Sequence, residues 1–222
     1  MPILLPSKSA DDWQQFLADP GKQWRTGYSA RTLAYSWQEA NGFPPEVRTV
    51  LGQQFADIEI LLGIPEHKVA MPGRGYASQT DLWVLARAGG ELVSVAVEGK
   101  VSEPFGPTVK EWLVEASDNK LTRLESIREL LGCKAQISGS IRYQLLHRAA
   151  SAILEAKRFR AKHAVLLIHS FSRTHEWLDD FVAFGAMLGV GVGVDRVTPV
   201  RQCDDVNFSM GWVCGDQNYL SR

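Results

Sequence analysis

The amino-acid sequence of 222 residues predicts a mixed α/β fold. Two runs of residues typical of strands, 80–88 and 91–101, flank Gly89-Gly90. This pair favours a tight hairpin, because glycine tolerates the positive φ angles of the primed turns. Over 46–62, apolar residues recur at intervals of three and four, the period of a helix. The continuous apolar stretch 164–168 is typical of a strand that is buried on both faces.

The elements before the hairpin are expected to be mostly helical. Segment 1–45 is rich in tryptophan and predicts short helices that form an N-terminal extension. Pro44-Pro45 ends this extension and begins the helix expected over 46–62, which Gly63 then stops. A short strand is expected over 67–71, directly before the hairpin.

After the hairpin, residues 103–140 are predicted to be an insertion that carries an amphipathic helix with Ser117 as its N-cap. A further helix is expected over about 141–160, followed by a strand over 163–171. The C-terminal segment is expected to complete the sheet of this single domain, 1–222, with one helix and two strands, over 174–188, 190–194 and 206–214 within 172–222.

Composition places limits on the environment and the partners of the chain. The 24 basic and 25 acidic side chains give a net charge of −1, so the whole molecule exerts no long-range attraction on nucleic acid. Since no apolar run approaches the roughly 18 to 20 residues that cross a bilayer, we expect no membrane span. The three cysteines form no CxxC pair, which favours reduced thiols and a cytoplasmic location.

The predicted hairpin has one apolar face and one face with paired charges. An even-length turn centred on Gly89-Gly90 places Asp81 opposite Glu98, with Lys100 two residues further on the same face. Opposed carboxylates repel each other, so this pair destabilises the hairpin unless it has a ligand. The reverse face is expected to join the core, and it carries Leu82, Val84, Ala86, Val93, Val95, Val97 and Val101.

A hard divalent cation is the ligand that suits this pair. Mg²⁺, or Mn²⁺ in its place, favours one or two carboxylates with backbone carbonyls and waters, and Asp81, Glu98 and the Gly99 backbone offer such ligands. Lys100 would then lie beside a metal-bound water, orient it and stabilise developing negative charge.

Asp81 followed by Glu98-Gly99-Lys100 on the next strand, in the order helix, three strands, helix, strand, resembles the PD-(D/E)XK nuclease superfamily. The resemblance covers about residues 46–171 and implies a restriction-endonuclease-like αβββαβ core. It implies that Asp81 and Glu98 hold the metal ion and that Lys100 assists the attacking water. The proline of the motif is absent, because Thr80 precedes Asp81.

The resemblance also implies auxiliary residues. Some members add an acid from the helix before the hairpin, for which Glu59 is the first candidate and Asp57 and Glu66 are weaker ones. Others carry Gln or Tyr on the helix after the triplet, where Gln144 is the first candidate and Tyr143 the second.

The segment from Ile141 to His163 is a candidate nucleic-acid contact. It contains six cations and one glutamate, a local charge of +5. Arg142, Tyr143 and Arg148 are the expected contact residues, since phosphate binding depends on such cations. The alternative is a solvated helix face whose cations gather near the C-terminus, where the helix dipole favours them.

The sequence therefore predicts a Mg²⁺- or Mn²⁺-dependent phosphodiester hydrolase, with DNA as the expected substrate, that acts as an endonuclease. The alternative is a catalytically inactive nuclease-like fold, a binding module in a bacterial system in which Asp81, Glu98 and Lys100 form a salt-bridged cluster. A metal-dependent hydrolase of small phosphoesters is a third possibility. The expected partner is nucleic acid, with a homodimer or a partner protein left open.

Overall fold

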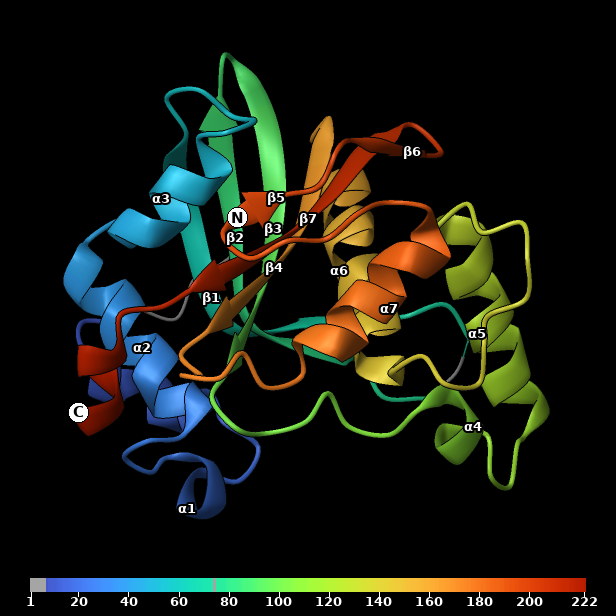
Figure 1. Ribbon diagram of the computed structural model, residues 1–222, viewed down its shortest axis with the longest axis horizontal. Coiled ribbons are helices and arrows are strands. Elements are labelled where there is room, and N and C mark those ends of the chain that lie inside the picture. Colours follow the sequence, from blue (N-terminus) through green and yellow to red (C-terminus); the bar gives the residue numbers. More distant parts are fainter. Residues whose placement is uncertain (1–6, 74) are drawn as a thin grey trace.

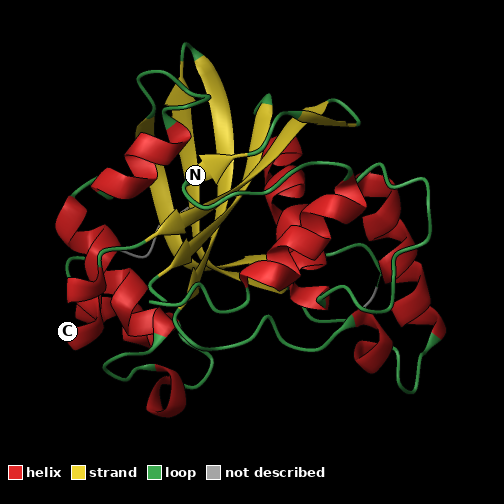
Figure 2. Ribbon diagram, viewed as in Figure 1, coloured by secondary structure: helices red, strands yellow, loops and turns green. Residues whose placement is uncertain are grey.

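The computed structural model describes residues 7–73 and 75–222, which form a mixed α/β fold, as predicted (Figures 1 and 2). The described strands form one sheet of seven, in the order β1-β2-β3-β4-β7-β5 with β6 paired to β7. These strands are β1 (Glu59–Val69), β2 (Ser78–Ala88), β3 (Glu91–Lys100), β4 (His163–Ser170), β5 (Arg196–Val197), β6 (Arg201–Cys203) and β7 (Val206–Cys214).

Helices lie on both sides of this sheet (Figure 1). They are η1 (Ala10–Phe16), α1 (Pro20–Gln23), α2 (Ser29–Ala40), α3 (Pro45–Leu51), α4 (Val109–Trp112), α5 (Asp118–Leu130), α6 (Tyr143–Phe159), α7 (Leu178–Leu188) and η2 (Gln217–Ser221). Of the helices described here, none has the length and apolar content needed to span a bilayer. The predicted N-terminal helices are present from Ala10, whereas residues 1–6 of that extension lie outside the described part.

The sheet combines an antiparallel meander with parallel central strands. β1, β2 and β3 are antiparallel neighbours, while β3, β4 and β7 are parallel ones. The predicted hairpin register is confirmed, because Leu82 pairs with Val97 and Ala88 with Glu91 around the two glycines. The carboxyl end of β3 therefore lies beside the start of β2 and the carboxyl end of β4.

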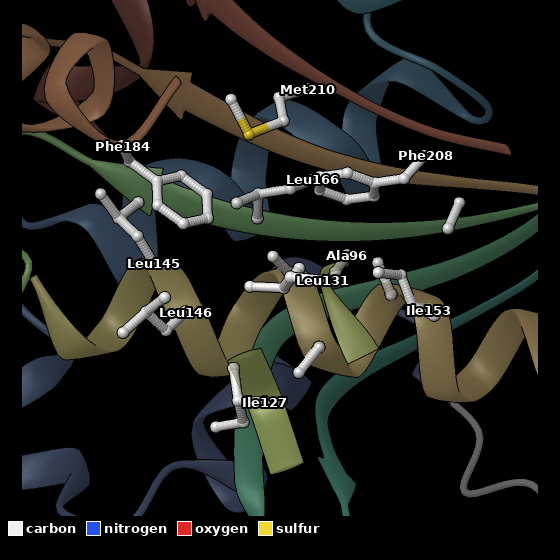
Figure 3. Packing of buried hydrophobic residues seen from close by; sticks show 14 of the residues in the cluster. Ala96, Ile127, Leu131, Leu145, Leu146, Ile153, Leu166, Phe184, Phe208 and Met210 are labelled. Carbon is white, nitrogen blue, oxygen red and sulfur yellow. The ribbon is translucent and has the colours of Figure 1, made fainter. Parts of the chain in front are cut away.

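Two apolar clusters hold the helices against the two faces. The first lies between the sheet and α5, α6 and α7, where Leu145 and Ile153 of α6 meet Ala96 of β3 and Leu166 of β4 (Figure 3). The second lies between the other face and η1, α2 and α3. The predicted core face of the hairpin belongs to this second cluster, with Leu82, Val84, Ala86, Val93, Val95 and Val97 buried in it and Val101 packed against it.

The helix predicted over 46–62 is shorter than expected. Helix α3 ends at Leu51, and Glu59 already begins β1. Phe55 and Ile58 are buried in the second cluster from the connecting loop, so they mimic a helical stripe without belonging to one. Over residues 59–64, exposed and partly buried residues alternate with a period of two, which is the period of a strand.

The C-terminal segment differs from its prediction in two ways. Helix α7 begins at Leu178 rather than at Thr174, after Trp177, which has a left-handed φ of 68°. Residues 190–194 contribute one isolated bridge at Val194 instead of a strand, and neither β5 nor β6 was predicted. By contrast, α6, β4 and β7 lie within one to two residues of their predicted bounds, and Ser117 caps α5 as expected.

Candidate functional site

The start of β2, the end of β3 and the first turns of α6 meet at a pocket of about 470 Å³. Four of the five predicted catalytic residues line it together, namely Asp81, Glu98, Lys100 and Gln144. Arg148 lines the same pocket one turn of α6 after Gln144. Helix α6 covers this face of β3, and positions four apart on a helix point the same way, so both polar side chains reach the strand end.

Glu98 is the centre of the polar contacts and is only 2% exposed. Its Oε1 accepts hydrogen bonds from Lys100 Nζ at 2.8 Å and from Gln144 Nε2 at 2.7 Å. Its Oε2 accepts one from Arg148 Nε at 2.5 Å. Gln144 Oε1 in turn accepts from Lys100 Nζ at 3.3 Å, which fixes the ammonium group between two acceptors.

The Arg148 guanidinium joins Glu98 to two residues of β2. Its Nη1 donates to Ser78 Oγ at 3.1 Å, and its Nη2 lies 4.0 Å from Asp81 Oδ1. Ser78 Oγ lies 2.8 Å from His147 Nδ1. Burial, together with the positive charge of Arg148, lowers the pKa of His147 well below 6.5. The imidazole is therefore neutral at pH 7 and shares a hydrogen bond with the Ser78 hydroxyl.

Asp81 is held by the backbone of the neighbouring strand. The Gly99 backbone N–H donates to Asp81 Oδ2 at 2.8 Å, and the Asp81 side chain is one-fifth exposed. A Cβ on Gly99 would lie 3.3 Å from Leu33 of α2 and 3.5 Å from Asp81 Oδ2. Glycine at this position therefore lets both α2 and the carboxylate approach the end of β3.

Glu66 brings a third carboxylate to the pocket from β1. Its Oε2 accepts a hydrogen bond from Gln79 Nε2 at 2.7 Å, and its own φ of 52° is left-handed. This backbone conformation is uncommon for a residue other than glycine. Glu66, one of the two weaker candidates for the auxiliary acid, thus lies at the site.

The pKa values of the three carboxyl groups diverge because their counter-charges differ. Burial, reinforced by the negative charge of Glu98, raises the pKa of Asp81 to about 7. Burial and the charge of Asp81 raise the pKa of Glu66 to about 8. Burial would also raise that of Glu98, but the charges of Arg148 and Lys100 outweigh it and hold the pKa at about 2. Near neutral pH, Glu98 is therefore ionised, whereas Asp81 and Glu66 tend to hold protons.

Glu59, the remaining predicted catalytic residue, does not lie at the site. It pairs with Arg87 across β1 and β2, and both side chains are about half exposed. Arg87 is six residues from Asp81 along β2, which corresponds to roughly 20 Å at the rise of a strand. The prediction placed Glu59 on a helix, whereas its position on β1 takes it to the opposite end of the hairpin.

The residues predicted to contact nucleic acid have three different environments. Arg148 lies in the pocket, as described above. Arg142 donates to Asp180 Oδ2 at 2.8 Å and to the Gly106 carbonyl at 2.9 Å, outside the pocket lining. Tyr143 is buried and stacks on Trp112, with ring centroids 3.8 Å apart. Tyr143 is therefore a core residue and is not placed to contact a ligand.

The basic segment is largely neutralised by its surroundings. Five of its six cations have acidic partners, in the pairs Arg142–Asp180, Arg148–Glu98, Lys157–Asp204, Arg158–Glu155 and Lys162–Glu91. Four of these acids come from outside the segment. The local charge of +5 that the sequence indicates does not form an uncompensated basic surface.

The oxygen ligands suit a small divalent cation. Within 7–73 and 75–222, no three His, Cys, Asp or Glu side chains are grouped closely enough to hold a metal ion by themselves. Mg²⁺, however, needs only one or two carboxylates and keeps several waters. Asp81 and Glu98 provide two carboxylates, and a cation between them would offset the charge of Glu98 that, together with burial, raises the pKa of Asp81. The residues present fit the ion that the sequence predicts.

Two features of the site were absent from the sequence prediction. One is the ion pair of Arg148 with Glu98, and the spacing of Arg148 four residues after Gln144 could have indicated it. The other is the cover that residues Ala18 to Ala30 place over the pocket. No local pattern signals that contact, because it depends on how the N-terminal extension folds back over the sheet.

The comparisons with known proteins place the chain in a family. The searches of curated proteins and of solved structures found no match to this chain. A family model described as "Domain of unknown function (DUF6946)" matches residues 6–217, nearly the whole chain. The chain therefore belongs to the DUF6946 family.

Proposed function

We propose that this protein is a metal-dependent phosphodiester hydrolase of the PD-(D/E)XK type, a nuclease that acts on DNA. One observation carries the proposal: a single pocket is lined by Asp81, Glu98, Lys100 and Gln144. These four residues are predicted catalytic residues from three separate segments of the sequence. The element order α3, β1, β2, β3, α6, β4 supports the proposal, because it is the αβββαβ order expected of such a nuclease, interrupted by a segment that carries α4 and α5.

In this proposal Asp81 and Glu98 hold Mg²⁺ or Mn²⁺, with the Gly99 backbone beside them. The ion would supply Lewis-acid activation of a water molecule and of the phosphoryl oxygens. Lys100, held by Glu98 and Gln144, orients the water and donates a hydrogen bond to the phosphate oxygen on which charge develops. The water oxygen bonds to phosphorus and releases one proton to solvent, the bond from phosphorus to the leaving sugar oxygen breaks, and that oxygen takes up a proton from solvent.

Cleavage of a supercoiled plasmid, in which torsional strain opens short unpaired stretches, and of a p-nitrophenyl phosphodiester in the presence of Mn²⁺ tests this function. We expect cleavage that requires the metal ion and falls at least a hundredfold in Asp81→Asn and Lys100→Met, both still folded by circular dichroism. Lys162→Met, which removes an exposed lysine paired with Glu91, is the matched control and should retain full activity. Equal cleavage by the two site variants would show that the proposal is wrong.

A second candidate function has its own observation. Arg148 and Lys100 both form ion pairs with Glu98. These two cations balance the negative charge of Glu98 without a metal ion. A non-catalytic nuclease-like module that binds a partner would have this arrangement. Calorimetry separates the two functions: the absence of Mg²⁺ and Mn²⁺ binding at millimolar concentrations favours the binding module, and binding that Asp81→Asn abolishes favours the hydrolase.

A further inference from the structure

The pocket is walled by the N-terminal extension as well as by the sheet. The lining residues from this extension are Ala18, Lys22, Gln23, Tyr28, Ser29 and Ala30. Glu103 ties this wall to the end of β3, because its Oε1 accepts from Ser29 N at 2.9 Å and its Oε2 from Val101 N at 3.0 Å. The wall is thus anchored at the start of α2, beside the carboxylates that it covers.

The reactive groups lie at the floor of this walled pocket. Glu98 is 2% exposed and Lys100 is 4% exposed. A phosphodiester must enter the pocket to come within hydrogen-bonding distance of Lys100. The phosphates of a duplex lie on a stiff cylinder, and enzymes with enclosed sites reach a paired nucleotide only by extruding it from the stack. An unpaired strand has the flexibility to enter, and about 470 Å³ is within the range of pockets for small ligands.

An aromatic side chain with basic neighbours stands at the pocket wall. Tyr28 lines the pocket and is 42% exposed. The Arg25 guanidinium lies 5.8 Å from the centroid of its ring. Lys22, whose exposed side chain pairs with Asp19 at 3.0 Å, lines the same wall. Aromatic rings on which bases stack, next to cations that follow the backbone, are the recurring elements of single-strand binding sites.

We propose that the substrate is single-stranded nucleic acid, and that the pocket excludes duplex. The inference rests on the proposed function and specifies its substrate class. An unpaired nucleotide places its base against Tyr28 and its phosphate above Asp81 and Lys100. Base stacking and phosphate charge do not distinguish DNA from RNA here, so the inference widens the proposed DNA substrate to single strands of either kind.

The test compares matched substrates with the full chain. Cleavage in Mn²⁺ is followed on a circular single-stranded DNA, a single-stranded RNA, a relaxed closed duplex circle and a p-nitrophenyl phosphodiester. Binding in Ca²⁺ is followed by fluorescence anisotropy of a labelled oligonucleotide, alone and annealed to its complement. We expect at least one single strand to be cut a hundredfold faster than the duplex circle, and to bind at least tenfold more tightly than its duplex.

Tyr28→Ala should weaken single-strand binding about tenfold, and Tyr28→Phe should restore it. Tyr76, which is 94% exposed and does not line the pocket, provides the control, because Tyr76→Ala should leave binding unchanged. Equal cleavage of relaxed duplex and single strand overturns the inference and leaves the proposed function in place. No cleavage of any substrate, the small phosphodiester included, overturns both.

Discussion

Arg148 Nε lies 2.5 Å from Glu98 Oε2, and the two side chains are only 8% and 3% exposed. The same guanidinium lies 4.0 Å from Asp81 Oδ1, so one fixed positive charge stands between the two carboxylates that are proposed to hold a metal ion. Glu98 is therefore ionised and held in place before any ligand arrives. The cost of burying two opposed acids is offset by a cation from α6.

The first prediction concerns stability. Arg148→Met leaves Glu98 buried with a weaker counter-charge, and removal of one partner of a buried ion pair destabilises proteins by about 3–5 kcal/mol. Lys100 still contacts Glu98, so we expect a decrease near the lower end of that range in the free energy of unfolding by urea.

Arg87→Met is the matched control, because it breaks the exposed pair with Glu59 and should change the free energy of unfolding by less than about 1 kcal/mol. The double variant Glu98→Gln, Arg148→Met should recover part of the loss. Equal destabilisation by Arg148→Met and Arg87→Met would contradict a buried pair at the site.

The second prediction concerns metal affinity. A fixed cation beside a metal site repels the ion, so Arg148→Met should bind Mn²⁺ about tenfold more tightly than the natural protein. Asp81→Asn should abolish binding, while Glu59→Gln should leave it unchanged, since Glu59 lies at the other end of the hairpin. Electron paramagnetic resonance of free Mn²⁺ measures all three affinities. Weaker binding in Arg148→Met would mean that the guanidinium supports the ion rather than competing with it.

Local patterns predicted the hairpin and its site because these depend on short-range geometry. The two glycines set the register, and the register alone brings Asp81 and Glu98 together. Glu59 was assigned to a helix because Phe55 and Ile58 continue the apolar spacing of α3, although they reach the core from a loop. Arg148 is predicted as a nucleic-acid contact, whereas its partner in the fold is Glu98, fifty residues earlier in the sequence. The four-residue spacing from Gln144 places Arg148 on the same side of α6, but periodicity alone does not identify a partner so far away.

The third prediction concerns pH. Asp81 and Glu66 have raised pKa values of about 7 and 8 in the fold, so between pH 4 and 8 the folded state binds more protons than the unfolded state. Since a difference of one in pKa corresponds to about 1.4 kcal/mol, the free energy of unfolding should fall as the pH rises from 5 to 8, by on the order of 6 kcal/mol. Glu98, with its lowered pKa of about 2, has the opposite sign, and its contribution is lost only as the pH falls below about 4.5.

Urea unfolding at pH 5 and pH 8 measures this dependence. Asp81→Asn and Glu66→Gln each remove one titrating group, so each should flatten the decrease in stability. Saturating Mn²⁺ should flatten it too in the natural protein, because a bound cation favours the ionised carboxylates. A natural protein that is more stable at pH 8 than at pH 5 without metal would show that the two acids are not protonated in the fold.

The last prediction concerns the packing of α7 against the loop that follows it. A Cβ on Gly185 would lie 2.4 Å from Val192 Cγ2 and 3.0 Å from the Val190 carbonyl oxygen, so glycine is required there for the chain to turn back against its own helix. Gly185→Ala should lower the free energy of unfolding by about 1–3 kcal/mol, since overpacking outweighs the gain in helix propensity. Gly191→Ala, with no atom within 4 Å of its Cβ, should be nearly neutral in the same urea titration, and equal effects of the two would refute the close approach.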